Sequence, residues 1–310
     1  MRVTILGSAA GGGFPQWNCN CRNCAAVRSG HPKFRARTQS SLAVSRDGEN
    51  WMLLNASPDL RQQINDTPAL AAKSEFGLRH SPIKAVVVTN GDVDHIAGLI
   101  NLREGQAFSL YGSDRVLGTI AANSLFNILA PAVVSRTILP LKTAMAVSGG
   151  GVDLGVTVEA FPVPGKVALY LEDEKAGPGL GTREGDTIGL EVRDPATGKS
   201  FFYIPGCAAV DEPLARRIAG AALVFFDGTV FTDDEMPSQG LPQKTGQRMG
   251  HMCMSGSSGS IAAFAPLNVN RRIYVHMNNS NPALEDGSDA RQYVERAGWD
   301  VGHDGMEIRL

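Results

Sequence analysis

The sequence predicts an α/β chain in which two β-sheets pack face to face with helices on the outside. Short strand-like runs recur along the whole chain, and helical patterns are interspersed between them. The Asp47-Gly48 turn joins two early runs into a hairpin, whereas a Rossmann-type start would need a helix after the first strand. Gly11–Gly13 is not followed by a helix-like segment either, so a dinucleotide-binding loop is not expected.

The elements of the first half follow from local patterning. Val3–Leu6 is typical of a strand that enters a glycine loop, and Ser113 or Asp114 is expected to cap a helix. Further strand-like runs lie at 37–45, 51–57, 84–90 and 108–113. Helical patterns cover 58–64, 97–104 and 113–129.

The second half continues in the same way. Strand-like runs lie at 156–165, 221–229 and 271–279, and the segment 187–207 is predicted to be a hairpin. A helix over 290–298 is expected to end at Gly298, its C-cap. A mobile surface loop is expected at 177–186. No repeat or linker demands a second domain, so the sequence predicts one domain over 1–310.

The composition excludes several classes of function. The chain has 310 residues, of which 43% are hydrophobic and 19% are charged, and its formal net charge is −2. This balance does not favour nucleic acid or a membrane surface as a partner. No run approaches the roughly 18 apolar residues of a membrane span, and no signal peptide is visible. We therefore expect a cytoplasmic protein with reduced thiols.

The segment TNGDVDH, Thr89–His95, directly follows the buried strand-like run KAVVV. A turn explains the Asn-Gly pair, but it does not explain Asp92, Asp94 and His95. Carboxylate and imidazole groups at the carboxyl end of a strand favour a metal site. The alternative is that one of the two aspartates only caps the following helix.

Cys19, Cys21 and Cys24 predict a structural zinc site, because thiols at this spacing converge readily on one metal. Zinc there would clamp the N-terminal loop at about 10–30. The alternative is a set of three reduced surface thiols, which a cytosolic protein would avoid.

The order of the strand-end motifs resembles the metallo-β-lactamase superfamily, whose members form an αββα sandwich. The usual first motif of that family is His-x-His-x-Asp-His. Here Asp94 and His95 match it, while Asn90 and Asp92 stand where the first two histidines would be. His276 matches the last histidine of the family.

Two further positions depart from the superfamily pattern. Lys166 stands at the usual third-motif histidine, and Cys207 stands at the bridging aspartate. The resemblance therefore implies a mononuclear site rather than a two-zinc hydrolase. The remaining ligands are Asp92, Asp94, His95 and His276. Such a set, with open positions, suits Fe(II) better than zinc.

A more specific resemblance runs from residue 1 to the end of the chain. The segments LGSAAGGGFPQWNCNCRNC, LLNASPDLRQQI, TNGDVDHIAGL, YIPGC and HMNNSNP together look like the coenzyme PQQ synthesis protein B family. Membership implies a role in making pyrroloquinoline quinone (PQQ). The family is described as a carrier of PQQ or its precursor toward the periplasm. It is also described as an iron-dependent hydroxylase that uses O₂ on the tyrosine of a cross-linked Glu–Tyr precursor.

The hydroxylase is the function that the unusual ligand set favours, and a metal-dependent hydrolase is a further alternative. In the hydroxylase, Asp92, His95 and His276 would hold iron, with Asp94 as a fourth ligand or as an orienter of an imidazole. Zinc could replace iron in the purified protein. Lys166 would bind a substrate carboxylate, the alternative being an exposed turn lysine. Contacts with other proteins of the PQQ pathway and a homodimer are left open.

The resemblance implies roles for several residues outside the ligand set. His251 lies where tRNase Z-like relatives carry a catalytic histidine, so an acid–base role or a substrate contact is expected. Asn279 stands at the fourth zinc ligand of phosphodiesterase relatives, and the fourth partner stays open between Asn279, a water and a nearby histidine. Cys207 could be a soft ligand, a reactive thiol or, as we favour, a small buried residue. The predicted substrate-binding set is Arg61, Arg79, Cys207 and His303.

Overall fold

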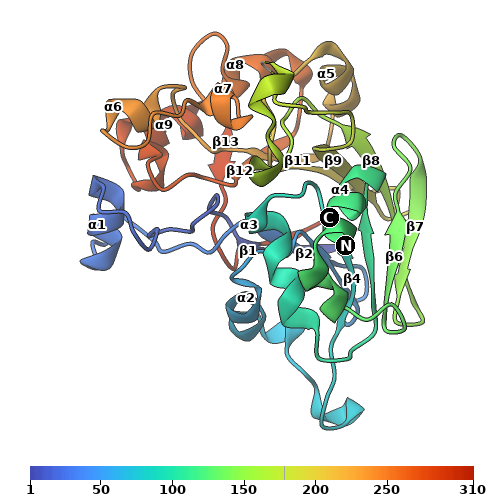
Figure 1. Cartoon of the computed structure of the whole chain (residues 1–310). Helices are drawn as coiled ribbons and strands as arrows, with labels where there is room; N and C mark the ends of the chain where they lie inside the picture. Colours follow the sequence, from blue (N-terminus) through green and yellow to red (C-terminus); the bar gives the residue numbers. More distant parts are fainter. Residues whose placement is uncertain (178) are drawn as a thin grey trace.

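The computed structural model describes residues 1–177 and 179–310. Within these residues, two seven-stranded sheets pack against each other, and helices lie on the outer side of each sheet (Figure 1). This αββα arrangement confirms the fold class that the sequence predicts.

The strand order is β14-β1-β2-β3-β4-β5-β6 in the first sheet and β13-β12-β11-β10-β9-β8-β7 in the second. The strands of the first sheet are β1 (Arg2–Gly7), β2 (Ser41–Ser45), β3 (Trp51–Leu54), β4 (Ile83–Val87), β5 (Phe108–Gly112), β6 (Val134–Ile138) and β14 (Glu307–Arg309). Those of the second are β7 (Ala144–Gly149), β8 (Val152–Pro162), β9 (Ile188–Arg193), β10 (Ser200–Ile204), β11 (Leu223–Asp227), β12 (Arg271–Val275) and β13 (Trp299–Val301).

The α-helices are short. They are α1 (Arg22–Arg28), α2 (Leu60–Asp66), α3 (Val93–Ile96), α4 (Asp114–Ala122), α5 (Glu212–Ile218), α6 (Glu235–Ser238), α7 (Gly246–Met249), α8 (Ser260–Phe264) and α9 (Asp289–Arg296). The 3-10 helices are η1 (Pro68–Leu70), η2 (Ser74–Phe76), η3 (Ala97–Leu102), η4 (Ser124–Ile128), η5 (Leu169–Leu171), η6 (Glu174–Ala176), η7 (Ala265–Leu267) and η8 (Pro282–Leu284).

Both sheets are mixed, and the direction of their strands positions the site. Strands β1 to β3 form an antiparallel meander, and β3 to β6 are parallel to one another. In the second sheet, β7 to β10 are antiparallel, whereas β10 to β13 are parallel. Parallel neighbours end at the same edge of a sheet, so the loops after β3, β4, β10, β11 and β12 gather there.

The hydrophobic core has three layers, one between the two sheets and one under the helices on each outer side. Most strands are therefore buried on both faces. Alternate side chains of β2 and β3, such as Leu42 and Leu54, join the apolar cluster between the sheets, where they meet Phe225 from the second sheet. The intervening side chains face outward. Leu53 contributes to a cluster under α2 and α4, and Phe226 contributes to one under α5, α8 and α9. This pattern explains why the strands read as near-continuous hydrophobic runs.

Several predicted elements differ in detail from the structure. The helix expected at 97–104 begins at Val93 as α3 and continues as the 3-10 helix η3. The helix expected at 113–129 ends at Ala122, and Ser113 caps it by accepting a hydrogen bond from the Val116 amide. The loop predicted at 177–186 includes residue 178, which lies outside the described residues. None of the helices in the described part of the chain combines the length and hydrophobicity that crossing a bilayer requires.

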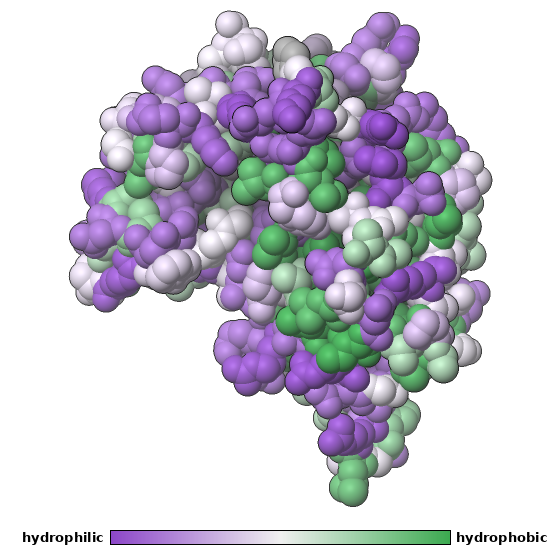
Figure 2. Space-filling model, in the orientation of Figure 1, coloured by the Kyte–Doolittle hydropathy of each residue, from purple (hydrophilic) through white to green (hydrophobic). Residues whose placement is uncertain are grey.

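Apolar side chains gather on one face of the molecule. Figure 2 shows them over α3, α4 and the segment that follows β8, while hydrophilic residues dominate the rest of this view. Exposed hydrophobic residues on or next to these elements are Val93 on α3, Leu125 on η4, and Leu169 and Tyr170 on η5.

Candidate metal centre

The candidate site lies where strands of both sheets end at a common edge. Strand β4 runs into Thr89–His95, while β11 and β12 run into Asp227–Thr229 and His276. A backbone hydrogen bond of 2.8 Å from the Ala10 amide to the Met277 carbonyl joins the end of β1 to the end of β12 at this point. Residues far apart in the sequence are thereby brought to one place.

Asp94, His95 and His276 form the first group of possible ligands, called the Asp94 group below. One ligand atom from each residue lies within 4.8 Å of the others. The Asp94 carboxylate reaches Nδ1 of His95 at 3.1 Å and Nε2 of His276 at 3.0 Å. The two imidazole rings are stacked, with their centroids 5.2 Å apart. Both histidine side chains are almost completely buried.

Asp227, His251 and His276 form a second group, called the Asp227 group below. Asp227 is fully buried, and its Oδ2 lies 2.6 Å from Nδ1 of His251. The Thr229 hydroxyl donates to Oδ1 of Asp227 at 2.6 Å and lies 2.9 Å from Nδ1 of His276. The amide of Cys207 also donates to the Asp227 carboxylate at 2.9 Å.

The hydrogen bonds determine which nitrogen of each imidazole carries the proton. The single hydroxyl proton of Thr229 goes to the Asp227 carboxylate, so the hydroxyl accepts from Nδ1–H of His276. The carboxylates of Asp94 and Asp227 accept from Nδ1–H of His95 and His251. In each of the three rings, Nε2 is therefore the nitrogen that is left for a metal ion, which binds imidazole in its neutral form.

The Asp94 group fits a divalent metal ion. Nε2 of His95 is buried and has no hydrogen-bond partner among the described residues. Nε2 of His276 lies 3.0 Å from a carboxylate oxygen of Asp94, a contact that either a proton on Nε2 or a cation shared by the two atoms satisfies. A buried imidazole nitrogen without a partner is unfavourable until a cation or a hydrogen-bond donor reaches it. Two imidazoles and a carboxylate are a common donor set for first-row transition metals.

The electrostatics favour ionised aspartate but differ among the histidines. Burial lowers the pKa of His95, but the Asp94 carboxylate reverses this, so the net change is upward. Burial raises the pKa of Asp94, but His95 and His276 more than offset this and hold the pKa well below its usual range. Burial lowers the pKa of His276 below its ordinary value, despite the nearby Asp94. Burial also lowers the pKa of His251, but the Asp227 carboxylate reverses the shift, so the net change is upward.

The backbone at His276 is held in an uncommon conformation. Its φ is +58°, in the left-handed region that costs a non-glycine residue about 1–2 kcal/mol. The next residue, Met277, is fixed on both sides because its amide donates to Ser8 and its carbonyl accepts from Ala10. Local strain that neighbouring structure enforces in this way is common at functional sites.

A cavity of about 260 Å³ opens onto both groups. Its lining includes Asp92, Lys166 and His251, as well as the Asp94 group. Asp92 lies in the wall but outside the two ligand groups, and its Oδ1 accepts the Leu169 amide at 2.9 Å. The side chain of Asp92 does not cap α3, which excludes that alternative. Lys166 is mostly buried and is not an exposed turn lysine.

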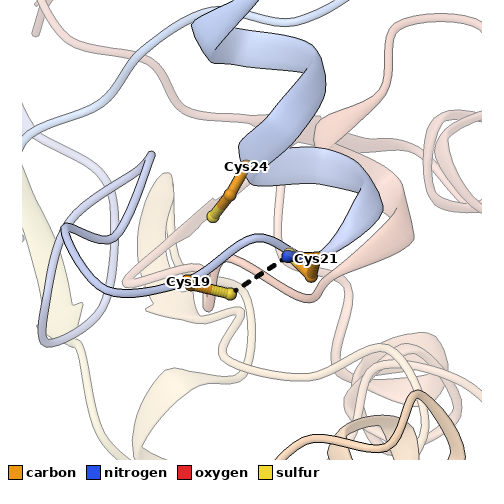
Figure 3. Close-up of side chains that lie close together, drawn as sticks. All are labelled: Cys19, Cys21 and Cys24. Carbon is orange, nitrogen blue, oxygen red and sulfur yellow. Dashed lines mark hydrogen bonds between the residues drawn. The ribbon is translucent and has the colours of Figure 1, made fainter.

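The cysteines converge at a separate place. Cys19, Cys21 and Cys24 lie at the start of α1 with their sulfurs within 4.8 Å of one another, and Figure 3 shows them around a common space. The side-chain amide of Asn279 lies 3.1, 3.7 and 3.3 Å from the three sulfurs. Rotation of this amide would place its carbonyl oxygen at the same point. All four residues expected at the zinc site are therefore brought together.

The predicted substrate-binding set does not line this cavity in the described part of the chain. Arg61 is exposed on α2, and Arg79 is exposed with a glutamate partner 3.7 Å away. The ring of His303 bonds to the carbonyl of the next residue. Cys207 is fully buried and its thiol donates to a backbone carbonyl, so it is the small buried residue that we favoured.

Three residues of the site received no role from the sequence, although the strand end at Asp227 is one of the motifs that carry the superfamily resemblance. Asp227 and Thr229 follow a buried strand, as TNGDVDH does, and that shared position was the available signal. Lys244 lines the cavity from the loop before α7, and nothing in its local sequence distinguishes it from a surface lysine.

Comparison with known proteins places this geometry in a family. Residues 50–277 match the model of the β-lactamase superfamily domain. The chain is 52% identical to the coenzyme PQQ synthesis protein B of Methylobacterium nodulans over 311 residues, which covers 100% of both chains. It is 49% identical to the Zn²⁺-bound PqqB from Methylobacterium extorquens, a crystal structure that covers 100% of both chains with a TM-score of 0.92. A diphosphatase from the PhnP family shares the fold alone, with 19% identity, a TM-score of 0.67, and coverage of 100% of this chain and 97% of the other.

Proposed function

We propose a function from one premise: the chain belongs to the β-lactamase superfamily and, within it, to the coenzyme PQQ synthesis protein B family. A role in PQQ biosynthesis follows from that membership. Within this role, we infer that the protein is an Fe(II)- and O₂-dependent hydroxylase of the tyrosine ring in a cross-linked Glu–Tyr precursor. The observation that carries this proposal is the Asp94 group, two imidazoles and one carboxylate on a cavity.

Ferrous iron held by Asp94, His95 and His276 would supply the activation of O₂ that ring hydroxylation needs. Hydroxylation replaces a ring C–H by C–OH. One atom of O₂ enters the product, and the other leaves as water with two protons and two electrons from a reductant such as ascorbate. Asp92, close by in the cavity wall, is a further candidate ligand.

His251 is the acid–base residue of this proposal. Its Nδ1–H is held by Asp227 at 2.6 Å, and the residue lines the cavity. Nε2 is therefore the nitrogen available to accept a proton from a substrate phenol. Thr229 and Asp227 act as positioning residues because they fix the tautomers of His276 and His251.

Structural zinc at Cys19, Cys21 and Cys24, with Asn279 as the fourth partner, completes the proposal. Thiolates are the preferred ligands of structural zinc, and the three sulfurs already share one space. A cytoplasmic location fits the absence of disulfides among the five cysteines, all of which are described.

A metal-dependent hydrolase is the second candidate, and the Asp227 group is the observation that favours it. Its members could hold a second metal ion next to the first, and paired metals are typical of hydrolytic sites. Thr229 counts against this, because its hydroxyl engages Nδ1 of His276 and the Asp227 carboxylate together.

The test is anaerobic reconstitution with Fe(II) or Zn(II), followed by O₂ uptake with the cross-linked Glu–Tyr compound and ascorbate. We expect uptake and a product mass gain of one oxygen with Fe(II) alone. His95→Ala should abolish both. His31→Ala is the matched control, because His31 is exposed and lies outside both ligand groups.

Each alternative predicts a different result. Zn(II)-dependent cleavage of a phosphodiester such as bis-p-nitrophenyl phosphate, without O₂ uptake, would establish the hydrolase. Tight binding of the Glu–Tyr compound with no turnover under either metal would contradict both enzymes and support a carrier.

A further inference from the structure

The metal-site cavity is lined by two lysines from different loops. Lys166 follows β8, and Lys244 lies in the loop between α6 and α7. Among the described residues that line the cavity, no other lysine and no arginine is present. Cations on the wall of a concave site raise the local concentration of anions and favour their binding.

Lys166 is already engaged by a carboxylate. Its ammonium donates to Oε1 of Glu172 at 2.7 Å, and Arg248 donates to both oxygens of the same residue at 3.2 and 2.8 Å. The hydrogen bonds from Arg248 and then Lys166 lower the pKa of Glu172 to about 2, despite its burial. The Lys166 stem lies against Gly250, where an added Cβ would meet it at 2.9 Å. Lys166 is therefore tethered, with one carboxylate shared by two cations.

Lys244 is in a different state. Lys244 takes part in none of the salt bridges found among the residues that the structure describes. Its backbone is fixed, however, because its amide donates to the Pro242 carbonyl at 2.7 Å and Thr245 then caps α7. Asp233 holds the start of α7 by accepting the amide of Gln247 at 2.8 Å. The loop thus presents an uncompensated cation at the cavity.

We propose that Lys244 is the residue that recognises a carboxylate of the substrate, while Lys166 supports the wall through Glu172. The inference deepens the proposed function, on which it rests, by naming the residue that binds a carboxylate of its substrate. The cavity of about 260 Å³ admits one arm of such a molecule next to the metal group. Lys244 then sets specificity by holding a carboxylate away from the reacting ring.

The experiment measures binding rather than turnover. Isothermal titration of the Zn(II)-loaded protein with the cross-linked Glu–Tyr compound is compared with titration of its carboxamide counterpart. Lys244→Met keeps the apolar stem and removes the charge. We expect it to weaken binding of the carboxylate compound about 10- to 100-fold, as loss of a charge-assisted hydrogen bond does. The carboxamide compound should bind the variant and the parent protein equally.

Lys199→Met is the matched control, because Lys199 is exposed on the β9–β10 hairpin and does not line the cavity. It should bind the carboxylate compound like the parent protein. Equal affinity of Lys244→Met and the parent for the carboxylate compound would overturn the proposal, and so would the absence of binding to the parent. A lack of O₂ uptake with a preserved Lys244 effect would instead contradict the hydroxylase alone.

Discussion

Replacing Thr229 with valine is expected to weaken metal binding at the Asp94 group without removing a ligand. The hydroxyl accepts Nδ1–H of His276 at 2.9 Å and donates to Asp227 at 2.6 Å. Valine leaves Nδ1–H of His276 without an acceptor, so the ring is free to rotate or to change tautomer. Loss of a partner that orients a metal-binding histidine costs about 10- to 100-fold in affinity.

The magnitude is consistent with the hydrogen bonds that are lost. One bond to a charged group contributes about 1.5–3 kcal/mol, and a tenfold change in affinity corresponds to about 1.4 kcal/mol. Asp227 keeps the amides of Thr229 and Cys207 as donors, so its own ionised state survives the substitution. The loss should therefore fall within that range.

Mn(II) is the metal for this assay, because thiolate sites such as the cysteine cluster favour softer ions. The free Mn(II) signal in electron paramagnetic resonance gives the dissociation constant directly. Thr137→Val is the control, since Thr137 lies in β6 and does not line the cavity. An affinity of Thr229→Val within threefold of the parent would refute the reasoning.

Three further predictions concern stability and the zinc site. Burial raises the pKa of Glu235 to about 7, so the folded state favours the protonated side chain. The free energy of unfolding should therefore fall by about 3 kcal/mol as the pH rises from about 4.5, the pKa in the unfolded chain, to 7. Glu235→Gln should remove this pH dependence in urea unfolding, and the same pH dependence in both proteins would contradict the prediction. Cys24→Ser should lower the zinc content by one ion per chain, whereas Cys253→Ser, which lies outside the cluster, should leave it unchanged. Equal zinc content of the two variants by mass spectrometry would count against the site. Gly98→Ala should destabilise by about 3 kcal/mol or more, because an added Cβ would lie 2.0 Å from a backbone oxygen. Gly118→Ala, with open space in α4, should be neutral or slightly stabilising, and equal melting temperatures for the two variants would be the contrary result.

The candidate ligands that could be predicted lie where a local sequence pattern marks the end of a strand. A hydrophobic run followed by TNGDVDH indicates a strand end, and parallel strands carry their sites there, so Asp94 and His95 required no tertiary information. His276 followed from the family resemblance. The cysteine cluster was visible because its members are adjacent in the sequence and need only one turn of α1 to converge.

Other residues could not be assigned because their roles depend on the tertiary structure. Asp227 at the end of β11 reaches His251 in the loop after α7, and a single sequence does not give the path of that loop. Arg61 and Arg79 were expected to contact substrate for their charge alone, but they lie on exposed segments outside the cavity lining. The predicted helix at 97–104 began too late because Val93, its true first residue, is exposed and interrupts the apolar pattern.

The large sequence separation within the Asp94 group has a thermodynamic consequence. Asp94 and His276 are 182 positions apart and come from different sheets, so the unfolded chain offers no comparable site. A metal ion at this site binds the native state alone. The melting temperature should therefore keep rising as the metal concentration is increased, because the unfolded chain does not bind the ion. The three cysteines lie within six residues and retain affinity for zinc after unfolding. Thermal shifts should therefore rise steeply with a hard metal and only weakly with added zinc once the cysteines are filled.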